Sequence, residues 1–388
     1  MFAYGILKLI YAPHKAFKEM IQNPKYHGPI LIMILFAAAY TGFEYVAASK
    51  VYDEQTIPTL LSGDEWTENH TLWSSNTSIT ITTSNDSLSG GYYGNKSIEY
   101  SLVNDKQIWA QLNFTEPINC SGLEGYKNVS FRIKPDYPNT TQPVNADFYL
   151  FFDQTDYFYY NLTEDFVSFT EPLWYNLTIA VGPESGWTES STSADWSNIN
   201  ILGFRFDWSE NSNITIRIDG LVFRGVFKPI IENVGSSVFN YSMGAFMQFV
   251  IKWVFLSGLL YIMIRGLGGK IVWKPLLVLV GSVLITIFIQ AMVNAALFST
   301  LPTIYRPLEL FSGVEGEFNV AAIKIMNDIL LVNNIYGYVQ MAVFVWTITL
   351  CALATREVAE FSLTKSFLVG SVAYFISMIA AGFIGFSI

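Results

Sequence analysis

The sequence predicts an α-helical transmembrane bundle of five spans joined to an all-β antiparallel jelly-roll sandwich outside the cytoplasm. Three observations lead to this prediction: five long apolar stretches, a block of short alternating strands, and twelve N-x-S/T sequons that all fall inside that block. The expected order is a cytoplasmic amphipathic helix in 1–27, a first span at 28–48, a glycosylated β-sandwich in 49–240 with its core at about 64–226, and four further spans in 241–388.

The apolar stretches have the length that a bilayer requires. A helix rises about 1.5 Å per residue, so about 20 residues cross a hydrocarbon core of roughly 30 Å. Soluble cores rarely need five such stretches, so we expect membrane spans rather than buried helices. They lie at 28–48, 244–264, 275–298, 334–355 and 366–388.

The sequons indicate which side of the membrane the strand-rich block occupies. An oligosaccharyltransferase reaches them only on the outer or lumenal side. Their confinement to one block therefore predicts an extracytoplasmic domain with N-linked glycans. A Ser-, Thr- and Asn-rich β-domain also forms sequons by chance, which is the alternative. The acceptors are Asn69, Asn76, Asn85, Asn95, Asn113, Asn119, Asn128, Asn139, Asn161, Asn176, Asn213 and Asn240.

Basic residues give an independent signal of orientation. The segments 1–27, 265–274 and 356–365 hold nine Lys and Arg, whereas 299–332 holds two against four acidic residues. Loops rich in Lys and Arg stay in the cytoplasm. The protein is therefore expected in the cell membrane, with its N-terminus in the cytoplasm and with 49–240 and the C-terminus outside the cell. The first span is expected to act as an uncleaved export signal, because no A-x-A-like cleavage site follows it.

The charge of the outer block narrows the class of partner. Residues 49–240 hold 24 acidic and 10 basic residues, and the rest of the chain holds 8 and 12, which together give the net charge of −10. Nucleic acid requires clustered Lys and Arg, so it is not expected as a partner. The expected partners are the lipid bilayer and other membrane or surface-layer proteins, with glycans as a further candidate. Cys120 and Cys351 fall on opposite sides of the predicted topology and are not expected to pair.

Short alternating runs separated by turn residues predict the strands of the outer block. The run 147–162 is predicted to form a hairpin with aromatic residues on one or both faces. Eight or so strands at this spacing favour an antiparallel sandwich. The predicted strands are 78–83, 96–102, 108–114, 129–135, 146–152, 174–181, 201–208 and 214–223.

The order of these strands resembles jelly-roll modules of the carbohydrate-binding and galactose-binding-like type. The resemblance rests on GGYYGNKSIEYSL, on NVSFRIKPD, and on the closing segment 195–225 with its IDGLVF pattern. It implies a sugar-binding role, and it implies that Asp219 helps to bind a structural calcium, with a solvent-facing or loop-capping Asp as the alternative. No other cofactor is expected.

Tryptophan is concentrated in the outer block, which holds seven of the ten. Aromatic faces stack on sugar rings, although each ring alternatively fills the sandwich core. Trp187 and Trp196 lie in the loop-like stretch GPESGWTESSTSADW, so they are predicted to be exposed and are the candidate glycan contacts.

The N-terminal segment resembles the Yip family of five-span membrane proteins, in its prokaryotic, archaeal type. The amphipathic pattern from Pro13 to Gln22 predicts a helix on the cytoplasmic leaflet. The chain departs from the family by about 190 residues inserted between the first two spans, where the family has a short loop. The matching positions are Pro13, Phe17, Asn23, Pro24, Tyr26, Gly28, Pro29 and the basic, glycine-rich loop 266–274.

Polar residues within the predicted spans are further candidates, and the four of most interest are Glu44, Lys252, Gln290 and Asn294. Polar groups in a bilayer are costly and often functional. Glu44 and Lys252 are predicted to pair or to lie at the interface, and Gln290 and Asn294 to form interhelical hydrogen bonds. Segment 318–332 is predicted to be a separate amphipathic helix on the outer leaflet.

Motifs of catalysis are absent from the sequence. None of the three histidines lies near a G-x-S-x-G, H-E-x-x-H or C-x-x-C pattern. A glycosidase with two carboxylates leaves no local pattern, so that alternative stays open. We therefore expect a non-catalytic membrane protein whose outer domain binds surface partners, glycans or subunits of a larger membrane complex. The alternative is a transporter-type accessory protein whose outer domain captures substrate.

Overall fold

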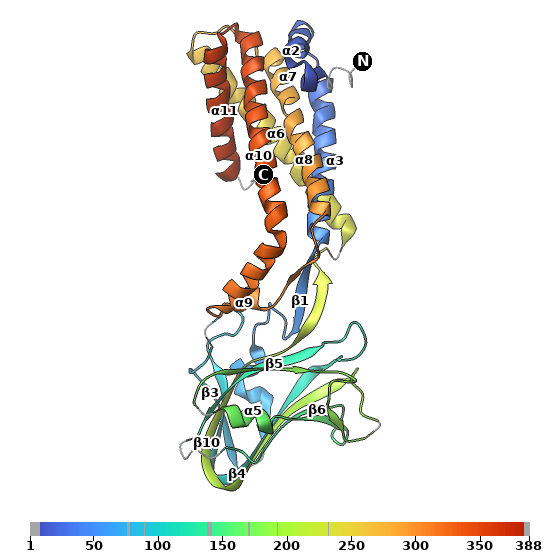
Figure 1. Ribbon diagram of the computed structural model, residues 1–388, viewed down its shortest axis with the longest axis vertical. Coiled ribbons are helices and arrows are strands. Elements are labelled where there is room, and N and C mark those ends of the chain that lie inside the picture. Colours follow the sequence, from blue (N-terminus) through green and yellow to red (C-terminus); the bar gives the residue numbers. More distant parts are fainter. Residues whose placement is uncertain are drawn as a thin grey trace. The chain divides into compact units, whose positions relative to one another are not determined.

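The computed structural model describes residues 8–75, 78–88, 90–137, 142–169, 171–191, 193–231 and 233–383. The chain forms two compact units (Figure 1). The helical unit consists of Met1–Val51, Pro229–Ile304 and Met326–Ile388, and the β unit consists of Tyr52–Lys228 and Tyr305–Ile325.

Five helices of the helical unit are long and apolar enough to cross a membrane, as the sequence predicts. The third, Trp273–Ser299, is the most enclosed, because 72% of its apolar window is buried against 17–39% for the others. The five are α3 (His27–Ser49), α6 (Val234–Gly266), α7 (Trp273–Val283) together with α8 (Ile285–Ser299), α10 (Glu317–Ala359) and α11 (Leu363–Phe383). The shorter helix α2 (Pro13–Gln22) precedes them.

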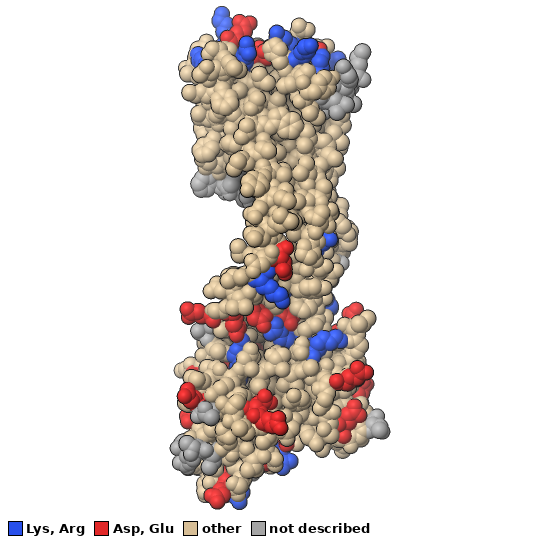
Figure 2. Space-filling view, viewed as in Figure 1, with Lys and Arg blue, Asp and Glu red and all other residues tan. Residues whose placement is uncertain are grey.

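Close packing and a charged end define this bundle. A Cβ on Gly281 would lie 2.5 Å from the indole nitrogen of Trp253, so the α6–α7 contact requires a glycine. The indole N–H of Trp253 donates to Leu277 O at 2.6 Å. Figure 2 shows Lys and Arg, with some acidic residues among them, gathered at the end of the unit that carries α2, where His14 meets Glu357 at 2.7 Å. The sides of the helices next to this end show no charged residue in this view.

The β unit is built on two long antiparallel strands, β4 (Ser97–Ile118) and β10 (Ile199–Pro229). Their register runs from Ile98–Ile218 to Ile118–Ile199 and is interrupted between Asp207 and Ile214. Asn104, opposite this interruption, has φ 51°, in the left-handed region that Asn tolerates. One half of each strand therefore lies in the first of two layers, and the other half lies in the second.

The remaining strands extend the two layers into one large antiparallel sheet. In the first layer, β3 and β5 flank β4 and β10, and β8 pairs with β5; in the second, β2 and β6 flank them, followed by β7 and β9. The strands are β1 (Val51–Ile57), β2 (Trp73–Ser75), β3 (Ile79–Ser84), β5 (Asn128–Asp136), β6 (Asn145–Phe151), β7 (Tyr157–Asn161), β8 (Tyr175–Ala180), β9 (Thr188–Glu189) and β11 (Ile304–Arg306), and the short helices are α4 (Glu65–Glu68), η1 (His70–Leu72), α5 (Thr163–Ser168) and α9 (Glu309–Ser312).

The two layers face each other across an aromatic core. Phe131 of β5 lies 5.2 Å from Phe204 and 5.5 Å from Phe148, ring to ring, and all three are fully buried. The eight predicted strands are all present, merged where β4 and β10 continue through the bends, and β6–β7 is the predicted hairpin.

A segment far along the chain completes the β unit, contrary to expectation. The sequence assigns 299–332 to the membrane region, but Tyr305–Ile325 belongs to the β unit. The helix predicted at 318–332 is present, but it is the first part of α10 and continues into the fourth predicted span.

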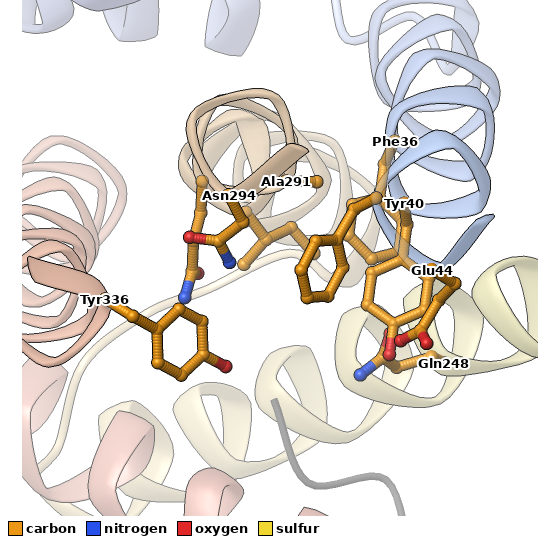
Figure 3. Close-up of a pocket in the computed structure, with 10 residues that line it drawn as sticks. Phe36, Tyr40, Glu44, Gln248, Ala291, Asn294 and Tyr336 are labelled. Atoms are coloured by element: carbon orange, nitrogen blue, oxygen red, sulfur yellow. The ribbon is translucent and has the colours of Figure 1, made fainter. Parts of the chain in front are cut away.

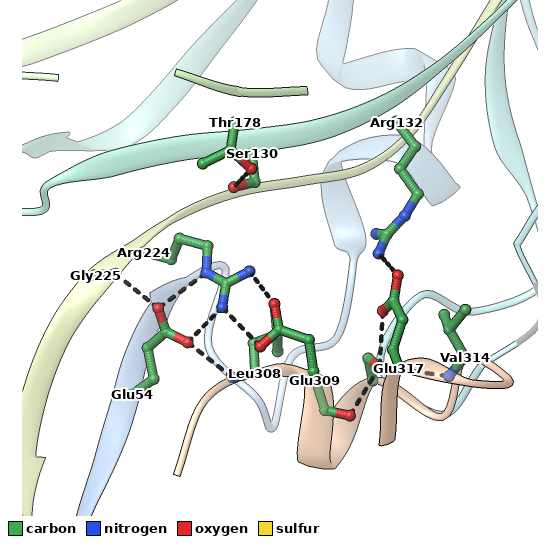
Figure 4. A network of polar contacts seen from close by, with 11 residues as sticks. Glu54, Ser130, Arg132, Thr178, Arg224, Gly225, Leu308, Glu309, Val314 and Glu317 are labelled. Atoms are coloured by element: carbon green, nitrogen blue, oxygen red, sulfur yellow. Dashed lines mark hydrogen bonds and ion pairs between the residues drawn. The ribbon is translucent and has the colours of Figure 1, made fainter. Parts of the chain in front are cut away.

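Three ion pairs join Tyr305–Ile325 to the rest of the β unit, through Glu309, Glu317 and Arg306. Figure 4 shows the first two. Arg224 donates to both carboxylate oxygens of Glu54 at 2.9 and 2.7 Å, and to Glu309 at 2.7 and 3.0 Å. Glu54 also accepts from the backbone N–H of Leu308 at 2.8 Å. Arg132 pairs with Glu317. Arg306 pairs with Asp53 at 2.6 Å, outside the area drawn.

We predict that Arg224→Met destabilises the β unit by about 3–5 kcal/mol, because it leaves the Glu54 carboxylate, which is 3% exposed, buried without its cation. The matched control is Arg306→Met, which releases the neighbouring Asp53; that side chain is 26% exposed, so a loss of about 0–1 kcal/mol is expected. Urea unfolding of the full-length protein in detergent, followed by tryptophan fluorescence, measures both. Equal losses would contradict the assignment.

Candidate functional site

Alternation along four neighbouring strands places a set of side chains on the outer side of the second layer. Successive residues of a strand point to opposite faces. Along β4, β10, β6 and β7 the even-numbered residues Ile108, Phe148, Phe158 and Phe204 are fully buried in the core. The odd-numbered residues therefore form the opposite face.

The register brings these odd-numbered residues into rows. Trp109 of β4 lies opposite Arg205 of β10, which lies opposite Asp147 of β6. In the next row Tyr149 lies opposite Tyr159, and beyond it Phe151 lies opposite Tyr157. We call this set the aromatic face; it consists of Trp109, Tyr149, Phe151, Tyr157 and Tyr159, with Gln107, Asp147, Arg205 and Asp207.

The aromatic rings touch one another in a continuous cluster. Tyr149 lies at its centre, with ring centroids 5.3 Å from Trp109, 5.8 Å from Phe151, 5.5 Å from Tyr157 and 6.0 Å from Tyr159. Phe151 is 6% exposed, and the other four are half-buried. Each of these four thus presents part of a ring to solvent while its neighbours fix its orientation.

A glycine leaves space for the cluster. Gly203 occupies the β10 position between Gln111 and Tyr149. A Cβ there would lie 3.2 Å from the Phe151 ring and 3.4 Å from the Trp109 ring. The absence of a side chain at 203 therefore lets both rings lie over the strand.

Polar groups border the rings. Asp207 pairs with Arg205 at 2.9 Å and accepts from the Gln107 amide at 2.7 Å. Asp147 accepts from the Tyr149 hydroxyl at 3.5 Å and from the Asn161 amide at 3.2 Å. Burial raises the pKa of Asp147, against the opposing charge of Arg205. The Arg205 side chain is 42% exposed, so donors as well as acceptors face solvent.

This arrangement has a defined chemical capacity. The apolar faces of sugar rings stack on Tyr and Trp, and planar amide, carboxylate and guanidinium groups hydrogen-bond the hydroxyls at the edge of a sugar ring. The aromatic face supplies both kinds of group on a rigid sheet.

The two tryptophans predicted as glycan contacts do not form this face. Trp196 is 5% exposed and stacks on Phe158 at 3.9 Å, so the prediction that it is exposed is wrong. Trp187 is half-buried, packs edge-on against Trp196, and donates its indole N–H to Ala180 O at 2.7 Å. Loop composition suggested exposure, but both indoles cover the edge of the core. The sequence signal for the aromatic face was the aromatic alternation in 147–162.

Most predicted glycan acceptors are accessible. Asn128, in β5, is half-buried, and Asn76 and Asn139 lie outside the described residues. Asn161 borders the aromatic face through its contact with Asp147. The exposed acceptors are Asn69, Asn85, Asn95, Asn113, Asn119, Asn161, Asn176, Asn213 and Asn240.

Asp219 lies in a buried carboxylate pair with Asp64. The Thr67 hydroxyl donates to Asp64 at 2.5 Å and to Asp219 at 3.3 Å, and the Gly220 N–H donates to both at 2.7 and 2.8 Å. Burial raises the pKa of Asp219 to about 6. Burial, and then the charge of Asp219, raise the pKa of Asp64. The pair therefore retains a proton where ordinary carboxyl groups have lost theirs.

The same residues are the ones that the predicted calcium site would use. Asp64 Oδ1 is buried without a hydrogen-bond partner, as an oxygen awaiting a cation would be. Calcium takes six to eight oxygen ligands, and the described residues hold no group of three or more His, Cys, Asp or Glu able to bind a metal. Calcium at Asp219 thus stays a prediction.

The structure brings together three of the four polar residues that the sequence analysis selected within the predicted spans. Glu44, Gln290 and Asn294 line one cavity of the helical unit. Lys252 does not line it, and the predicted pairing of Lys252 with Glu44 is wrong, because the Lys252 Nζ is buried without a hydrogen-bond partner in the described structure. The amide oxygen of Asn294 also has no partner.

Comparison with solved structures finds sugar-binding modules. The chain is similar to the family 11 carbohydrate-binding module from Clostridium thermocellum in complex with a β-1,3-1,4-mixed-linked tetrasaccharide, at 13% identity and a TM-score of 0.30, over 45% of this chain and 95% of that one. It is also similar to the family 30 module of a cellulosomal cellulase from Clostridium thermocellum, at 11% identity and a TM-score of 0.28, over 42% and 93%. An exo-β-agarase is similar at 12% identity and a TM-score of 0.30, over 43% and 24%.

At these identities and TM-scores the similarity carries no argument about what the chain binds. No protein-family model and no curated protein matches the chain. The resemblance to the Yip family stays a prediction.

We predict that the carboxylate pair makes the β unit less stable as pH rises from about 4 to about 6. The folded pair holds a proton that the unfolded carboxyl groups, with pKa values near 4, release over this range, so its contribution is full below the lower value and is lost through the higher. Hydrogen exchange of β5 peptides in the full-length protein measures the effect, and Asp219→Asn is expected to flatten the dependence.

An unchanged pH dependence in Asp219→Asn would show that other groups cause it. The same peptides test the metal: calcium is expected to slow their exchange in the unsubstituted protein and to leave Asp219→Asn unaffected. Calcium without effect on either protein rejects the predicted site.

Proposed function

We propose that this protein is a non-catalytic membrane protein that displays a glycan-binding β unit on the outer surface of the cell. The aromatic face carries this proposal. Its half-buried rings, held by neighbouring strands and bordered by Arg205, Asp147, Asp207 and Gln107, provide the stacking surface and hydrogen-bonding edge that an oligosaccharide needs.

The helical unit supports the membrane anchor. Its outward-facing side chains are large and apolar, for example Ile262 at 68% exposure, Met341 at 65% and Val345 at 57%. Such a continuous apolar surface is incompatible with water and suits lipid. Charges gathered at the end that carries α2 fit the cytoplasmic head-group region (Figure 2).

The outward position of the β unit is supported by its sequons. Eight of their asparagines are exposed among the described residues, and Asn240, at the start of the helical unit, is exposed as well. Surface-layer proteins or subunits of a larger membrane complex that carry glycans are the partners this arrangement favours. The transporter-type accessory role remains the second candidate, and the polar cavity that contains Glu44 favours it.

We predict that the full-length protein binds oligosaccharides on a glycan array, and that Trp109→Ala or Tyr149→Ala weakens this binding on the order of tenfold or more, as loss of a central aromatic contact does. The matched control is Trp187→Ala, which removes an indole outside the face and is expected to leave binding unchanged. Each variant is first checked for folding by its β-unit unfolding midpoint.

Absence of binding at high protein concentration would reject the glycan proposal. Loss of binding in Trp187→Ala with retention in Trp109→Ala would move the site to the loops.

We predict that protease added to intact cells cleaves within 49–240, while an N-terminal tag stays protected. Mass spectrometry is expected to find glycans on exposed acceptors such as Asn85, Asn95 and Asn213, and to find Asn128 bare because it is half-buried within the paired strand β5. A protected outer block, or bare asparagines throughout, would refute the proposed orientation.

A further inference from the structure

The helical unit contains a partly open polar cavity among its apolar helices. The cavity has a volume of about 190 Å³. Figure 3 shows Tyr40, Glu44, Gln248, Asn294 and Tyr336 around one space, contributed by α3, α6, α8 and α10.

Two oxygen atoms beside this cavity lack the hydrogen bonds that burial demands. Gln248 Oε1 and Asn294 Oδ1 have no hydrogen-bond partner among the described residues, although both residues are 2% exposed. Some buried hydroxyls of the bundle are satisfied locally: Ser257 donates to Trp253 O at 2.6 Å, and Ser282 to Val278 O at 2.8 Å. The hydroxyls of Thr355, Ser366 and Ser371 also lack a partner among the described residues, but these residues do not line the cavity. A buried acceptor without a donor costs stability, so a donor supplied by a ligand would remove that cost.

The charge of the lining defines the sign of that ligand. Glu44 is the one charged residue among the lining residues. Aromatic rings surround it: Phe36 lies 5.4 Å from Tyr40, and Tyr40 lies 5.9 Å from Phe43, ring to ring. A carboxylate together with aromatic faces is the environment that stabilises a desolvated ammonium group.

The volume limits the size of the ligand. A protein cavity of about 150 Å³ holds benzene, so this slightly larger cavity takes a compact molecule of roughly six to ten non-hydrogen atoms. Gln248, Gln290 and Asn294 add amide groups that either donate or accept hydrogen bonds.

We propose that this cavity is a binding site for a small organic cation that carries an ammonium group. Glu44 pairs with the ammonium group, and the rings of Tyr40 and Phe43 contact the apolar part of the ligand. The amide oxygens accept hydrogen bonds from the remaining N–H groups of the ammonium. The site is independent of the aromatic face, because every lining residue belongs to the helical unit.

Lys252 provides a test of whether the ligand is a cation or an anion. It lies one helical turn after Gln248 on α6, does not line the cavity, and has no partner for its ammonium. Its positive charge opposes a cationic ligand and would favour an anionic one. Neutralising Glu44 and neutralising Lys252 must therefore change the affinity in opposite directions.

The experiment titrates benzylammonium into the full-length protein in nanodiscs by calorimetry, with benzyl alcohol as the neutral ligand of equal size. We expect benzylammonium to bind more tightly than benzyl alcohol. Glu44→Gln is expected to weaken benzylammonium on the order of tenfold or more and to leave benzyl alcohol unchanged, as loss of a charge-assisted hydrogen bond predicts. Lys252→Met is expected to strengthen benzylammonium binding.

Two further variants control for folding and location. Ala291→Phe fills the cavity and is expected to abolish the binding of both ligands, whereas Thr349→Val, on the exposed side of α10, is expected to change neither. Thermal unfolding confirms that each variant folds. Equal affinity for the two ligands, no response to Glu44→Gln, reversed signs in the two charge variants, or no benzylammonium binding at millimolar concentration would overturn the proposal.

Discussion

Side-chain alternation along β4 and β10 is the constraint on which the β unit depends. Each strand passes through both layers, with one register on each side of the interruption between Asp207 and Ile214. In the second layer this register positions Phe204 in the core and, on the opposite side, Arg205 beside Trp109, and in the first layer it positions Ile216 in the core. A shift of one residue would exchange core and surface along the whole strand. The buried rings therefore fix the exposed ones, and the candidate site takes its geometry from the packing beneath it.

Buried charge plays a comparable part where the second chain segment joins this unit. Arg224 satisfies Glu54 and Glu309 together, and Glu54 in turn holds backbone N–H groups of Gly225 and Leu308. Burial would raise the pKa of Glu309, but the hydrogen bonds and charge of Arg224 outweigh it and lower that pKa. Such a network specifies one arrangement because each acid is satisfied only in that geometry.

Periodicity predicted the five apolar helices, the eight strands and the 147–162 hairpin, because each is a local pattern. Long-range contacts had no such pattern: nothing in the local sequence of 305–317 indicates that Arg132 and Arg224 bind it. Composition misplaced Trp196, since a serine-rich loop still folds its indole onto Phe158. The polar residues of the predicted spans were recognised by residue type. The cavity that three of them share could be recognised only from the structure, because its residues come from helices far apart in the sequence.

The β unit is assembled from Tyr52–Lys228 and Tyr305–Ile325, so no single continuous segment of the chain contains all of it without part of the helical unit. A recombinant fragment ending at residue 228 would leave Arg132 and Arg224 without two of their acids and would remove Ser312, whose carbonyl accepts from the Tyr92 N–H. Evolutionary transfer of this module between proteins would likewise have to move two separate stretches of gene.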